Sequence, residues 1–105
     1  MSRIKSLINK YKNRIKYGFF DDETWNLDYT MAKFILPRLK RFRDITKCYP
    51  PELKSLDEWQ KILDKMIWGF DSIVNGYDDF LNPEHNKKQQ EGLDLFSKYF
   101  TALWW

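Results

Sequence analysis

With 105 residues, the chain has the length of one small domain, and its net charge of +3 is too mild to indicate nucleic acid by itself. A single cysteine, Cys48, excludes an internal disulfide, and the absence of any run of about 20 apolar residues excludes a membrane-spanning helix. The basic start lacks the long apolar run and small-residue cleavage site of a signal peptide. We therefore expect one helical domain over residues 1–105, located in the cytoplasm and without a membrane partner.

Aromatic residues are unusually abundant. Five Trp, six Tyr and eight Phe make up 18% of the chain, and each can bury roughly 150–250 Å². A small core that relies on large side chains explains most of them. The remainder would supply aromatic surface for a partner or ligand, because Trp and Tyr are favoured at interfaces.

The first predicted helix ends before Gly18, a residue typical of the position after a helix C-terminus. Residues 1–17 include six basic and no acidic residues. This pattern favours a solvated basic face, although an anionic membrane surface or nucleic acid would also suit it. Acidic and basic blocks alternate along the rest of the chain, which favours charge pairing between helices or between copies. The apolar stripe of this helix is Ile4, Leu7, Ile8, Tyr11 and Ile15.

The second predicted helix begins after Asn26, a plausible N-cap, and continues to about Thr46. Pro37 interrupts it, and proline removes a backbone hydrogen bond and clashes with the preceding turn, so we expect a kink or a break there. Arg38 projects into the middle of the apolar stripe. That stripe consists of Leu27, Met31, Phe34, Ile35, Phe42 and Ile45.

The third and fourth predicted helices have clear N-terminal signals. Ser55 followed by Glu58 is a capping-box pattern, and Asn82-Pro83 pairs an N-cap with proline at the first helical position. In the last helix the apolar stripe runs from Leu93 to Leu103. Its backward continuation is polar, so we expect the first two turns to project beyond the core or to face a partner. The fold class is all-α, a small bundle of about four helices.

Arg38 is the first candidate functional residue. A guanidinium in an apolar stripe needs an internal carboxylate, an anionic ligand, or a kink that rotates it outward. An internal ion pair at a kinked helix is the simpler interpretation. The alternative is an anion site, because cations interleaved with aromatics can hold phosphate while a ring stacks on a base. The predicted ligand-binding residues are Trp25, Lys33, Arg38 and Arg41.

Three tryptophans are candidate interface residues. Trp68 lies opposite the apolar stripe of the third helix, so either a second layer covers it or it is exposed for a partner. Trp104 and Trp105 at the end of the chain need burial against another element or another copy. Together with the opposed charge blocks, they predict a homo-oligomer.

Enzyme motifs are absent from the sequence, which contains no phosphate-binding glycine loop, no zinc-binding His-Glu-x-x-His and no nucleophile elbow. One His and one Cys are too few for an ordinary zinc site, and carboxylates in turns are usually solvated. We expect a non-enzymatic protein with no catalytic residue, no metal and no cofactor.

The segment ETWNLDYTMAKFILPRLKRF, from Glu23 to Phe42, resembles a segment of small uncharacterised proteins encoded by tailed bacteriophages, and the Trp59–Phe70 helix is similar too. This resemblance implies a phage accessory protein in the bacterial host cytoplasm that works by binding. With the Arg38 cluster, it leads us to expect an anti-defence protein that sequesters an anionic, nucleotide-like signalling molecule. The alternatives are an interaction module that inhibits a host protein and, more weakly, a nucleic-acid-binding protein.

Overall fold

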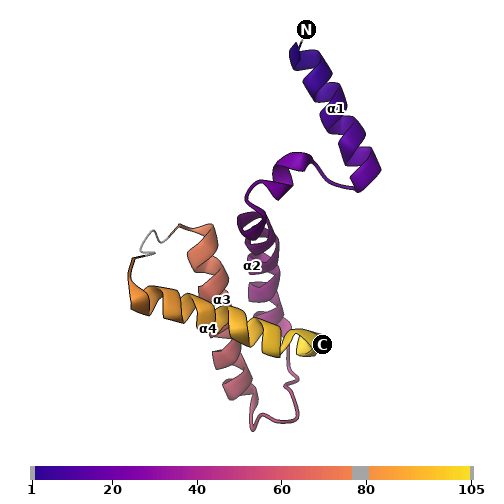
Figure 1. Cartoon of the computed structure of the whole chain (residues 1–105). Coiled ribbons are helices and arrows are strands. Elements are labelled where there is room, and N and C mark those ends of the chain that lie inside the picture. The colour runs from indigo at the N-terminus through magenta and orange to yellow at the C-terminus, as the bar shows by residue number, and fades with distance from the viewer. Residues whose placement is uncertain (1, 77–80, 105) are drawn as a thin grey trace. The chain divides into compact units, whose positions relative to one another are not determined.

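A computed structural model of the chain describes residues 2–76 and 81–104, and these ranges contain helices and no strand (Figure 1). The predicted all-α fold of about four helices is confirmed. The chain divides into two compact units, residues 1–31 and 32–105. The elements are α1 (Ser2–Tyr17), the short 3-10 helix η1 (Asp21–Thr24), α2 (Leu27–Ile45), α3 (Leu56–Val74), α4 (Pro83–Lys98) and the 3-10 turn η2 (Phe100–Ala102).

The predicted helix ends are mostly correct. Gly18 adopts φ +84°, a left-handed conformation that favours glycine, and its N–H donates to the carbonyl of Arg14. The Ser55 hydroxyl accepts from the Glu58 N–H at 3.2 Å, and the Asn82 side chain accepts from the Glu84 N–H at 3.0 Å. Local capping chemistry therefore determines where these helices begin and end.

Helix α2 continues unbroken through Pro37, so the predicted break does not occur. Its buried residues are Ala32, Leu36 and Leu39. The predicted apolar stripe was wrong for its first half, because Leu27, Met31 and Phe34 are each more than half exposed. The side of α2 that enters the core is therefore not the side that carries the predicted apolar stripe.

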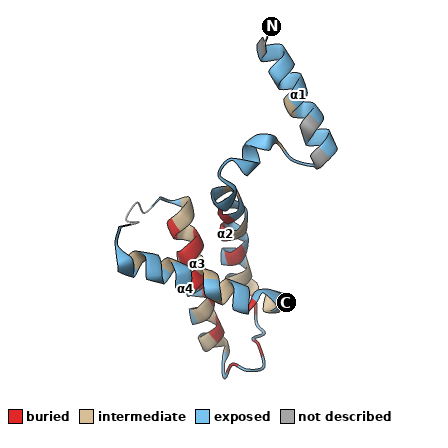
Figure 2. Ribbon diagram, viewed as in Figure 1, coloured by how far each residue is buried: buried red, intermediate tan, exposed pale blue. Residues whose placement is uncertain are grey.

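The core belongs to the second unit and centres on α3, as the buried segments in Figure 2 show. Trp59, Leu63 and Met66 are almost completely buried. The Trp59 ring packs edge-on against Phe42 of α2 and against Tyr99, which follows α4. One large side chain of α3 therefore holds elements from both ends of the unit.

Helix α4 crosses α3 at a pair of glycines, Gly69 and Gly92, both buried (Figure 1). A Cβ atom on Gly92 would lie 2.5 Å from the carbonyl oxygen of Lys65 and 3.1 Å from the Cα of Gly69. Both obstacles are backbone atoms, which cannot swing away as a flexible side chain could. The two helices approach this closely only because neither glycine has a side chain.

A hydrogen-bonded polar pair lies beside the glycine crossing. The Gln89 amide donates to the Ser72 hydroxyl at 2.8 Å, and that hydroxyl donates to the Gly69 carbonyl at 2.7 Å. Ser72 is buried and Gln89 is half-buried, so both polar groups are satisfied where water is largely excluded. The first turns of α4 therefore pack on α3, and the prediction that they project beyond the core or face a partner was wrong.

Two ion pairs join helices at the surface of the second unit. The Arg43 guanidinium of α2 makes a two-point contact with the Asp64 carboxylate of α3, and Lys65 of α3 pairs with Glu91 of α4 at 2.9 Å. The hydrogen bond that Arg43 donates to the Asp64 carboxylate raises the pKa of Arg43. Because these side chains are a third to a half exposed, the pairs align helices more than they stabilise the fold.

We predict that Gly92→Ala destabilises the protein by about 1–3 kcal/mol, because the added methyl group forces the helices apart. Intrinsic helix propensity alone would give the opposite sign, a gain of about 1 kcal/mol. The measurement is the free energy of unfolding from urea denaturation. Gly69→Ala should lose less, since its nearest obstacle lies at 3.2 Å, and the exposed Lys87→Ala should change little. A Gly92→Ala protein as stable as the wild type would contradict the crossing.

Candidate functional site

A largely apolar groove opens on the second unit, with a volume of about 250 Å³. Five of its residues come from α2, and α4 with the segment after η2 supplies the opposite wall. We call this site the α2 groove. It is lined by Phe34, Ile35, Arg38, Leu39, Phe42, Phe96 and Leu103.

Arg38 is the only charged residue among those that line the α2 groove. It is exposed, because the predicted apolar stripe around it is not the side of α2 that enters the core. Its guanidinium stacks on the Phe34 ring at 3.7 Å from the centroid, and Nη1 donates to the Phe34 carbonyl at 2.9 Å. No carboxylate of the described residues forms an ion pair with it. The guanidinium is thus held at the edge of an apolar groove with donors to spare.

The groove walls are fixed by contacts that lead into the core. Phe42 packs edge-on against the buried Trp59, with ring centroids 6.5 Å apart. Phe96 packs in the same way against Phe70 at 4.8 Å and against Phe100 at 5.4 Å. Such aromatic pairs restrict ring orientation. The aromatic rings that line the groove are therefore held in fixed orientations by the core.

The structure brings together only part of the predicted ligand-binding set. Arg38 and Arg41 are exposed and, at three residues apart, share the flank of α2 that carries Phe34. Lys33 is exposed, and helical spacing puts it on a different flank. Trp25 is 87% exposed but belongs to the first unit. We therefore restrict the candidate site to Arg38, Arg41 and the apolar groove.

Trp68, one of the predicted interface residues, is half-buried within the second unit. The His85 ring packs edge-on against it at 5.3 Å, and the Lys88 ammonium lies 4.2 Å from the centre of its ring system. Both neighbours come from the first turns of α4. Of the two interpretations of Trp68, coverage by a second layer is therefore the observed one, and the covering side chains come from α4.

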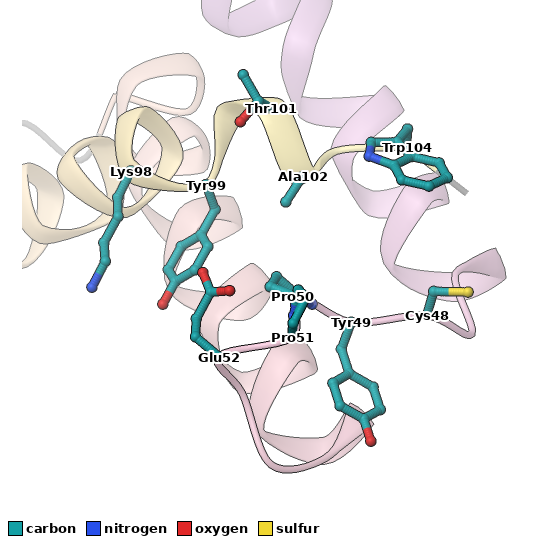
Figure 3. A pocket seen from close by; sticks show the side chains of 10 residues that line it. All are labelled: Cys48, Tyr49, Pro50, Pro51, Glu52, Lys98, Tyr99, Thr101, Ala102 and Trp104. Atoms are coloured by element: carbon teal, nitrogen blue, oxygen red, sulfur yellow. The ribbon is translucent and has the colours of Figure 1, made fainter.

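Trp104 is 73% exposed and lines a second pocket of about 300 Å³, drawn in Figure 3. Tyr49 and Tyr99 contribute aromatic walls to this pocket, and its two charged residues, Lys98 and Glu52, have opposite sign. It therefore offers no net charge to an anion or cation. Trp105, the third predicted interface residue, lies outside the described residues.

Sequence reasoning missed the groove itself. The sequence patterns place Ile35, Phe96 and Leu103 in apolar stripes, and in the structure all three are partly buried against the core. Their role follows from the way α4 ends at Lys98, so that Leu103 lies beyond η2 and beside α2. The one signal in the sequence was the excess of aromatic residues over the needs of a small core.

The described part of the chain contains neither a metal-binding cluster nor a membrane-spanning helix. Across residues 2–76 and 81–104, no group of three or more His, Cys, Asp or Glu side chains could hold a metal ion. In those same ranges no helix is both long and apolar enough to cross a bilayer. No match to the chain was found among protein-family models, curated proteins or solved structures.

We predict that Phe34→Ala lowers the free energy of unfolding by less than about 1 kcal/mol, because the ring is 59% exposed. Leu36→Ala, two residues along the same helix, should cost about 2–5 kcal/mol, because Leu36 is buried. Urea denaturation of both variants measures the difference. Equal losses would mean that the face of α2 carrying Phe34 is part of the core.

Proposed function

We propose that this protein is a non-enzymatic interaction module whose α2 groove binds an apolar, acidic segment of a partner protein. The observation that carries the proposal is the arrangement of Arg38, an exposed cation without a carboxylate partner in the described chain, at the edge of an apolar groove. Amphipathic helices bind grooves of this kind through apolar anchors. A neighbouring carboxylate on the partner would pair with the guanidinium.

The chemistry of the groove favours a peptide over a highly charged small molecule. Its lining is almost entirely aromatic and aliphatic, so most of its surface gains from contact with apolar side chains. A phosphate-rich ligand would need several converging donors. The groove itself offers one cationic side chain, and one face of Phe34 is already occupied by it.

The likeness of Glu23–Phe42 to phage-encoded segments supports a bacterial host protein as the partner. In that setting the module would inhibit the host factor by occupying the surface to which the acidic segment belongs. Fixed groove walls favour this mode, because a preformed site competes well with the natural partner of the host protein.

We predict that a photoreactive amino acid at Phe34 cross-links a bacterial protein, whereas the same group at Lys40, on the other side of α2, does not. The purified partner should then bind Arg38→Glu at least about tenfold more weakly than wild type, because charge reversal repels its carboxylate. Lys40→Glu is the matched control and should bind normally in isothermal titration calorimetry. Equal cross-linking from both positions, or unchanged affinity of Arg38→Glu, would refute the proposal.

A second candidate is capture of an anionic, nucleotide-like signal, which the shared flank of Arg38, Arg41 and Phe34 favours. Two cations on one helical flank can grip a single phosphate group while an apolar base occupies the groove.

If this second candidate is correct, cyclic nucleotides or ADP-ribose should raise the melting temperature of the wild-type protein. Arg38→Ala and Arg41→Ala should each abolish that rise, and Lys40→Ala should preserve it. A thermal-shift screen measures the effect. A screen in which no nucleotide stabilises the protein would refute this second candidate.

A further inference from the structure

Helix α1 of the first unit carries an exposed apolar arc. The arc consists of residues that recur at helical spacing and so share one side of the helix: Ile4, Leu7, Ile8, Tyr11 and Ile15. Exposed fractions range from 48% for Ile8 to 85% for Ile15. An aliphatic arc of this size left in water indicates a binding surface.

Cations border the apolar arc on both sides. At about 100° per residue, Arg3, Lys10 and Arg14 line one edge. Lys5, Lys12 and Lys16 line the other edge, and no acidic residue interrupts either row. The opposite side carries uncharged polar residues, among them Ser6 and Asn9. Around its axis the helix thus has the apolar arc, a row of cations along each edge of the arc, and an uncharged polar side opposite the arc.

The first unit itself packs against only a small part of α1. The Phe20 ring meets Tyr11 edge-on at 5.6 Å, and Lys10 and Arg14 lie over the same ring. The Lys10 ammonium also pairs with Asp22 at 2.9 Å, which lowers the pKa of that carboxyl and raises the pKa of the amine. These contacts fix the chain that follows α1, and Ile4, Leu7 and Ile8 stay exposed.

Charge decides which occupant fits the arc. A second copy of α1 would place its rows of cations against the rows of cations of the first copy, and like charges at such positions oppose helix pairing. Nucleic acid would satisfy the cations but leave the isoleucines and the leucine in water. An anionic bilayer surface satisfies both sets at once, because the arc enters the acyl region while Arg3 on one side and Lys5 and Lys12 on the other reach the lipid phosphates.

We propose that α1 binds the surface of an anionic phospholipid bilayer, lying in the plane of the interface. This differs from spanning the bilayer, for which the helix is too short. The mode of binding is that of an amphipathic interfacial helix, with hydrophobic insertion and electrostatic attraction both contributing. It involves the first unit alone and does not depend on the function of the α2 groove.

The test is flotation of the full-length protein with vesicles. We expect it to float with vesicles of phosphatidylglycerol and phosphatidylcholine, and to stay behind with phosphatidylcholine alone. Added salt should weaken the binding, because it screens exposed charges. Absence of binding to the anionic vesicles, or equal binding to both kinds, would overturn the proposal.

Three variants and one control separate the contributions of hydrophobic insertion and charge. Ile8→Asn should reduce partitioning about tenfold, since it removes an inserted side chain. Each of Lys5→Gln and Lys12→Gln should reduce it by about fivefold. The control Asn9→Ser lies on the uncharged polar side of α1 and should bind like wild type.

All four positions are exposed, and an unchanged circular dichroism spectrum excludes unfolding as the cause of any loss. If Ile8→Asn binds the vesicles like wild type, hydrophobic insertion does not occur and the proposal fails. If the protein instead binds duplex DNA, and Ile8→Asn does not weaken that binding while the lysine variants do, α1 is a nucleic-acid-binding helix.

Discussion

The close approach of Gly69 and Gly92 is the constraint on which the second unit depends. It allows the α4 backbone to touch the α3 backbone, and this contact places Gln89 within hydrogen-bonding distance of Ser72. The same crossing sets the direction of α4 and of the chain that follows it, so that Phe96 and Leu103 form one wall of the α2 groove. A wider crossing would lose the polar link and displace that wall. The shape of the candidate binding site therefore depends on glycine at both positions 69 and 92.

Much of the local structure could be predicted from the sequence because it depends on near neighbours. Gly18, Ser55 and Asn82 act through backbone groups a few residues away, so the helix ends followed from residue type and position. The orientation of α2 could not be predicted in this way. Its most apolar stripe runs through Phe34, yet the helix buries Ala32, Leu36 and Leu39. The core cluster includes small Ala32 while the larger Phe34 stays exposed, so hydrophobicity alone does not determine which side of α2 is buried.

The candidate site was predictable in chemistry but not in geometry. The sequence pattern indicates a cation among apolar residues at Arg38. In the structure Arg38 does border an apolar surface, but this surface is the exposed α2 groove and not the core. The opposite wall of the groove depends on where α4 ends relative to α2, which no local pattern encodes. The prediction for the polar start of α4 was wrong because it also depended on a residue far away in the sequence. Gln89 looks like a surface residue until Ser72, seventeen positions earlier in the chain, is placed beside it.

The glycine crossing also has a consequence for tracing the ancestry of the chain. On α3 the crossing uses Gly69 and Ser72, and on α4 it uses Gln89 and Gly92, so each helix contributes a glycine and a polar residue three positions apart. Each member of this set is required by the others: a methyl group on either glycine separates the helices, and separation breaks the polar link. Distant homologues should keep all four residues or replace them together. Paired Gly-x-x-Ser and Gln-x-x-Gly patterns on successive helices would then identify such homologues after the surface sequence has diverged.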